Sequence, residues 1–284
     1  MRSTQGRGDG MGRRGFAVVP VLIRFWLPHR MSSAVVGIIL VAALVTAAIS
    51  GVFGMAGGLI LMGVLASYVP VATAMVLHGF IQIISNFSRA AFLWKHISWT
   101  IIARYALGIG GALLLIAMIA WRPTQPEVFI TLGLTAMLVW IPKSWIEINV
   151  ERRFQAEICG FLVQTLNTLS GVAGPLLDLF FVKTLLSRQT VVATKAATQV
   201  MAHAVKIAFW GFPLIGILSD PATAAKASFP PVWMFAAVVP LSLVGTWAGG
   251  RVLERMTDVS FRNWTKWIVT ATGLVYLARG AWLG

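Results

Sequence analysis

Two stretches of the chain carry polar side chains at helical spacing within apolar surroundings. In "HGFIQIISNFSR" the polar residues follow one another at steps of four, four and three, and "KAATQVMAHAVK" repeats those steps. At about 100° per residue, each set occupies an arc of about 80° on one face of a helix. We call these sets the polar stripes: His78, Gln82, Asn86 and Arg89 in the first stretch, and Lys195, Gln199, His203 and Lys206 in the second.

The polar stripes have the chemistry of a site for a small anion. They contain three cations, Arg89, Lys195 and Lys206, and no carboxylate. Arginine can bind an oxyanion through two parallel hydrogen bonds, lysine provides a point charge, and the amides of Gln82 and Gln199 add neutral donors. We therefore expect both stripes to contact one anionic substrate.

The stripes also have a structural interpretation, which fits some of their residues better than others. An ionisable side chain in the middle of a membrane helix costs about 2.5 to 3.5 kcal/mol on insertion, so such residues usually face a bundle interior or a watery cavity. Arg89 and Lys195, however, lie about one and a half turns from predicted helix ends and could extend to the lipid headgroups. His203 and Lys206 lie deeper in their helix, which favours a functional role for them.

The composition indicates a helical membrane protein. The 284 residues are 58% hydrophobic and only 11% charged, whereas a soluble domain is about 25% charged. The apolar runs are long and continuous, and the alternating polarity of outer-membrane strands does not occur. The predicted fold class is therefore all-α, a polytopic membrane helical bundle.

The charge pattern fits a membrane topology better than a nucleic-acid partner. The formal net charge is +14, but the basic residues are spread over loops and helix ends, and six arginines lie in the first thirty residues. This tail favours a cytoplasmic N-terminus. The one cysteine, Cys159, has no partner for a disulfide or a Cys-based metal site, and we expect no metal and no cofactor.

The chain divides into two similar halves. We expect a basic tail at 1–31, a first transmembrane repeat at 32–141, a charged linker at 142–157 and a second repeat at 158–284. As a single helix, the apolar run 32–69 would be about 57 Å long, so it must break, most readily at "GVFGMAGG". The second half has a matching run at 158–186, interrupted at "SGVAGP".

Further spans follow each broken run in the same order. They are expected at 71–94, 99–121 and 126–141 in the first half, and at 189–211, 231–253 and 264–283 in the second. A shift of about 117 residues places Gly54 and Gly57 on Gly171 and Gly174, and Gln82 on Gln199. Such paired broken helices are typical of internally duplicated transporters. The bundle has eight spans if each broken run is one crossing, or ten elements if each is a hairpin, which would invert one half relative to the other.

The glycines at the two breaks are candidate ligands through their backbone. Breaking a helix frees N–H groups at the new N-terminus, and such a terminus attracts anions. We therefore include Gly54, Gly57, Gly58, Gly171 and Gly174 in the predicted substrate site. The alternative is close helix packing through small residues.

Asp178 follows the second break and has no acidic counterpart in the first half. It has three possible roles: to complement the positive end of its half-helix, to pair with Lys195 or Lys206, or to carry a proton in a coupled cycle together with His203. Four further polar residues are expected to be mainly structural: Gln164, Asn167, Ser170 and Thr194.

These motifs resemble a known family. "GVFGMAGG" and "VATAMVLHGFIQIISNFSR" in the first half, with "SGVAGPLLDLFFVK" and "VVATKAATQ" in the second, are similar to the TauE/SafE family of sulfite-exporter-like permeases. The resemblance extends over roughly 32–283. It implies a multi-pass permease of the bacterial inner membrane, built from two homologous halves, that moves sulfur-containing anions or other small organic acids.

The predicted function is a secondary transporter of small anions. Its expected partners are the anion and the lipid bilayer, with a homo-oligomer left open, and the chain has no GxxxxGK[ST] motif for ATP. An anion channel built from the same groups is the alternative. An intramembrane serine protease is disfavoured because "TLSG" has Thr168 where a GxSG motif needs glycine, so we expect no enzyme.

Overall fold

The computed structural model of the chain describes residues 31–284 except 120–121, 143, 146 and 220–229. Within these residues, the chain forms ten α-helices and two short 3-10 helices, and no strand. The prediction of an all-α protein is confirmed. The predicted basic tail at 1–31 lies outside the described residues apart from Met31.

Five α-helices precede the connection around residue 150. They are α2 (Ser33–Phe53), α3 (Ala56–Tyr68), α4 (Val71–Phe92), α5 (Trp99–Ile119) and α6 (Gln125–Met137), with the 3-10 helices η1 (Trp94–His96) and η2 (Leu138–Trp140). Helix α6 begins with a capping box, in which Thr124 and Glu127 satisfy each other's free backbone groups.

Five α-helices follow that connection: α7 (Gln155–Ser170), α8 (Gly174–Phe181), α9 (Arg188–Ser219), α11 (Val232–Leu253) and α12 (Asp258–Leu283). Helix α7 begins at Gln155, so the last three residues of the predicted linker at 142–157 lie in its first turn. Glu157 is favoured there by the positive end of the helix, and its carboxylate pairs with Arg104 of α5 at 2.9 Å.

Both glycine-interrupted runs fold back on themselves. Gly54 ends α2 with φ +65°, a conformation that glycine adopts readily, and α3 then returns along α2. The return is tight, because a Cβ on Gly57 would overlap the carbonyl oxygen of Thr46. In the second run, Gly171 ends α7 with φ +87°. Helix α8 then returns toward the start of α7.

A hydrogen bond marks where α8 ends. The amide of Val150, just before α7, donates to the carbonyl of Phe180 at 2.9 Å. The end of α8 therefore lies beside the beginning of α7. Each broken run is a hairpin, so the ten-element alternative describes the helices better than eight single crossings.

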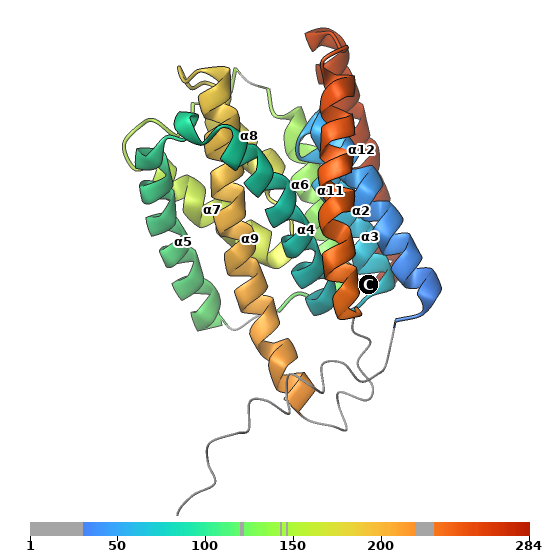
Figure 1. Cartoon of the computed structure of the whole chain (residues 1–284). Helices are drawn as coiled ribbons and strands as arrows, with labels where there is room; N and C mark the ends of the chain where they lie inside the picture. The colour runs from blue at the N-terminus through green and yellow to red at the C-terminus, as the bar shows by residue number, and fades with distance from the viewer. Residues whose placement is uncertain (1–30, 120–121, 143, 146, 220–229) are drawn as a thin grey trace, which may run out of the picture.

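The helices pack in pairs that join the early and late parts of the chain. Helix α2 packs on α11, α5 on α7, α4 on α9 and α6 on α12, with α4 and α9 between the α5–α7 and α2–α11 pairs (Figure 1). Glycines allow the close approaches: a Cβ on Gly249 would overlap the carbonyl of Ala48, and one on Gly160 that of Tyr105. The two central helices carry the polar stripes.

The outer surface is apolar, as a membrane protein requires. Among the described residues, helices α2, α4, α5 and α11 are long and apolar enough to cross a bilayer. Helix α5 exposes Leu107, Leu114 and Met118 at 71%, 69% and 85%. Large exposed apolar areas of this kind are rare on soluble monomers but expected against lipid. The chain is therefore a helical membrane protein.

Candidate functional site

The two polar stripes face each other across the α4–α9 contact. His78 and His203 lie edge to face, with ring centroids 5.4 Å apart. Six of the eight stripe residues are buried: His78, Gln82, Asn86, Gln199, His203 and Lys206. The stripes therefore point into the bundle and away from lipid.

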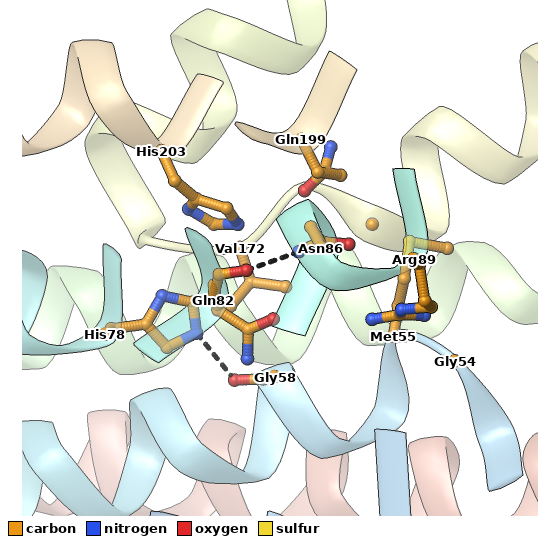
Figure 2. Close-up of a pocket in the computed structure, with 11 residues that line it drawn as sticks. Gly54, Met55, Gly58, His78, Gln82, Asn86, Arg89, Val172, Gln199 and His203 are labelled. Carbon is orange, nitrogen blue, oxygen red and sulfur yellow. Dashed lines mark hydrogen bonds between the residues drawn. The ribbon is translucent and has the colours of Figure 1, made fainter. Parts of the chain in front are cut away.

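A small cavity lies between the stripes and the two hairpin turns (Figure 2), with about 310 Å³ of empty space when its opening to solvent is included. Nine residues predicted from the sequence line it: Gly54, Gly58, His78, Gln82, Asn86, Arg89, Gly174, Gln199 and His203. Two further lining residues, Met55 and Val172, lie on the turns and were not predicted, because an apolar side chain in an apolar run gives no signal. The cavity thus draws on four elements that are distant in sequence.

Arg89 is the predicted cation that lines this cavity. It lies beside Gly54 and Met55 at the first turn (Figure 2), and its Nε donates to the carbonyl of Ser85 at 3.2 Å. No carboxylate of the described residues pairs with it. The remaining guanidinium donors are therefore available to an anion.

Amide and imidazole groups complete the polar lining. Asn86 donates from Nδ2 to the carbonyl of Gln82 at 2.9 Å. Nε2 of Gln199 and Nδ1 of His203 are buried without a hydrogen-bond partner among the described residues. Because buried polar atoms are nearly always paired, such atoms beside a cavity indicate a place for a polar ligand or water. A Cβ on Gly58 would lie 2.9 Å from Nε2 of Gln82, so the glycine leaves room for that amide.

Lys206 does not line the cavity. Its side chain is fully buried, and Nζ donates to the carbonyl of Gly171 and to Nδ1 of His78, both at 2.8 Å. His78 in turn contacts the carbonyl of Gly58 through Nε2 at 2.9 Å. A carbonyl only accepts, so Nε2 carries the proton and Nδ1 is the acceptor for Lys206. This chain of hydrogen bonds joins the turn after α7 to the start of α3.

The other predicted site residues also lie outside the cavity lining. Lys195 forms an ion pair with Asp178, which is one of the three roles considered for that acid. Gly57 packs against α2, and Gly171 supplies the carbonyl that Lys206 binds.

The additional polar residues on α7 and α9 make internal hydrogen bonds. Gln164 donates to Thr168 at 2.8 Å and Asn167 to the carbonyl of Ala202 at 3.1 Å. The hydroxyl of Ser170 donates within its own turn, and that of Thr194 accepts from the amide of Ser98. The Asn167 contact joins α7 to α9, and the Thr194 contact joins α9 to the residue before α5.

Comparison with known proteins identifies the family. The family model described as "Sulfite exporter TauE/SafE" matches residues 38–276 of the 284, a range that includes both hairpin turns, both stripes and the cavity. No curated protein and no solved structure matches the chain. The resemblance inferred from the glycine motifs is confirmed. The chain belongs to the sulfite exporter TauE/SafE family, a family of membrane transport proteins.

Proposed function

We propose that the protein is a secondary transporter of a small anion, such as sulfite, a sulfonate or a related organic acid, in a bacterial-type inner membrane. The observation that carries the proposal is the cavity at the meeting point of two helix breaks, with Arg89 as its cation. A half-buried cation inside a membrane helix bundle is costly, and an anionic substrate offsets that cost. Membership of a sulfite exporter family supports the same class of substrate.

The anion would bind between Arg89 and the two glutamine amides. Arg89 offers paired donors, Gln82 and Gln199 offer neutral donors, and the free Nε2 of Gln199 points to a missing partner. Lys206 would act on the site indirectly, by holding the second turn through Gly171.

We further propose that the chain is an inverted repeat, with α2 to α6 equivalent to α7, α8, α9, α11 and α12. The packing supports this, because exchanging equivalent helices leaves the set of main contacts unchanged. The contact of α2 with α11 becomes that of α7 with α5, while α4–α9 and α6–α12 exchange with themselves. An odd number of elements in each half gives the halves opposite orientations. Transporters with inverted repeats bind substrate between the halves and open to alternate sides.

Counterflow in proteoliposomes tests the transporter proposal. Vesicles preloaded with unlabelled sulfite are expected to accumulate ³⁵S-labelled sulfite transiently and saturably, and sulfonates of similar size are expected to compete. A carrier gives this overshoot because one site faces each side in turn. Single-channel currents without counterflow would contradict the proposal and favour an anion channel.

A further inference from the structure

Asp178 and Lys195 form an ion pair directly beside the cavity. Asp178 lies one turn after Gly174 on α8, and Lys195 lies one turn before Gln199 on α9. Gly174 and Gln199 both line the cavity. The pair therefore joins two of its walls, and neither member is sealed from solvent, with exposed side-chain fractions of 47% for Asp178 and 23% for Lys195.

Without the aspartate, the site would have a second cation. Arg89 lines the cavity, and Lys195 lies one turn from Gln199, which lines it too. Without Asp178, both positive groups would attract the same anion. Asp178 neutralises one of them. The equivalent position in the first half is occupied by Leu61, a fully buried apolar residue. The acid is thus a feature of one side of the site only.

We propose that Asp178 is a tethered counter-ion, which holds Lys195 while the cavity is empty and releases it to the transported anion. The inference rests on the proposed function. The anion would displace the carboxylate of Asp178 from Lys195. Because that ion pair must break first, the anion binds more weakly than it would to two cations that have no counter-ion. A transport site needs this compromise, because binding must be favourable enough for entry and weak enough for release. Asp178 is therefore a positioning residue that acts through Lys195.

The test separates the KM for ³⁵S-sulfite from the maximal rate in proteoliposomes. Asp178→Asn is expected to lower KM about threefold to fivefold, equivalent to about 0.6 to 1 kcal/mol for a partly exposed pair, and to slow release. Asp178→Glu keeps the carboxylate and is expected to retain the parental KM. Lys195→Gln is expected to raise KM.

The decisive comparison is the double variant. If Asp178 acts through Lys195, Asp178→Asn has no effect on KM once Lys195→Gln is present. An unchanged or higher KM in Asp178→Asn, or the same decrease in the Lys195→Gln background, overturns the inference. A lower maximal rate with parental KM does so as well and points to a proton carrier.

Two further measurements keep the result interpretable. Sulfite-dependent thermal stabilisation of the purified protein in detergent gives the same comparison of affinities for any variant that does not transport.

Arg89→Ala separates the proposed function from the proposed role of Asp178. Parental transport in Arg89→Ala contradicts the proposed site itself. If Arg89→Ala loses transport but Asp178→Asn keeps the parental KM, only the counter-ion role of Asp178 is contradicted.

Discussion

Nζ of Lys206 lies 2.8 Å from Nδ1 of His78, across the contact between α9 and α4. The same Nζ donates to the carbonyl of Gly171, and His78 donates to the carbonyl of Gly58. The two residues thereby join the turn of one hairpin to the returning helix of the other. This link connects the two hairpins on either side of the cavity.

Replacing Lys206 by methionine should destabilise the protein. Methionine fills similar space but leaves the carbonyl of Gly171 and Nδ1 of His78 without a donor, and each unpaired buried group costs about 1 to 3 kcal/mol. Thermal unfolding in detergent micelles measures the effect. Lys95→Met is the matched control, because Lys95 is exposed in η1. Equal melting temperatures for both variants would show that the Lys206 link carries no stability.

Gly54→Ala and Gly37→Ala should act in opposite directions. Neither new Cβ would meet an atom within 4 Å, but Gly54 has φ +65° and Gly37 lies within α2. Alanine in a left-handed conformation costs about 1 to 2 kcal/mol. In a helix interior, alanine gains about 0.5 to 1 kcal/mol over glycine. If both substitutions raise the unfolding free energy, or both lower it, the result would argue against a helix break at Gly54.

Gly58→Ala should reduce the rate of sulfite transport while it leaves the stability of the protein largely unchanged. The added methyl group would lie 2.9 Å from Nε2 of Gln82, whose flexible side chain can shift but then leaves its place at the cavity. Gly110→Ala is the control, since nothing lies within 4 Å of that position. Initial rates of ³⁵S-sulfite uptake at matched protein content compare the two. Uptake by Gly58→Ala at the control's rate would exclude Gln82 from the site.

Gln199→Leu should impair transport without loss of stability. Nε2 of Gln199 has no partner among the described residues, so removing it leaves no new unpaired group and costs little. Gln164→Leu should instead lower stability and leave transport by the folded protein unchanged, because Gln164 donates to Thr168 outside the cavity lining. Melting temperature and uptake rate are measured on both variants. A stable, fully active Gln199→Leu would remove that amide from the proposed binding set.

The sequence predicted the elements better than it predicted the side-chain partners. Glycine pattern and run length predicted breaks within "GVFGMAGG" and "SGVAGP", and Gly54 and Gly171 end the helices there, because backbone conformation is a local property. The spacing of four, four and three located both stripes. Whether Asp178 pairs with Lys195 or with Lys206 depends on how α8 folds back toward α9, and no local sequence pattern encodes that arrangement.

Lys206 illustrates the same limit. Its charge and depth predicted contact with substrate, but its actual partners, Gly171 and His78, come from two other helices whose positions the sequence does not give. Pairing of α2 with α11 was likewise unpredictable, because it joins two apolar faces through glycine contacts.

The central claim is that Arg89 holds the transported anion in the cavity. The most direct test is counterflow of ³⁵S-sulfite by Arg89→Ala, with Arg251→Ala as the control, because Arg251 is exposed and stacks over Trp247. At equal levels of folded protein, we predict that Arg89→Ala loses at least about tenfold in rate, as expected for a charge-assisted contact of 1.4 kcal/mol or more, and that Arg251→Ala transports like the parent. Parental counterflow in Arg89→Ala would contradict the account.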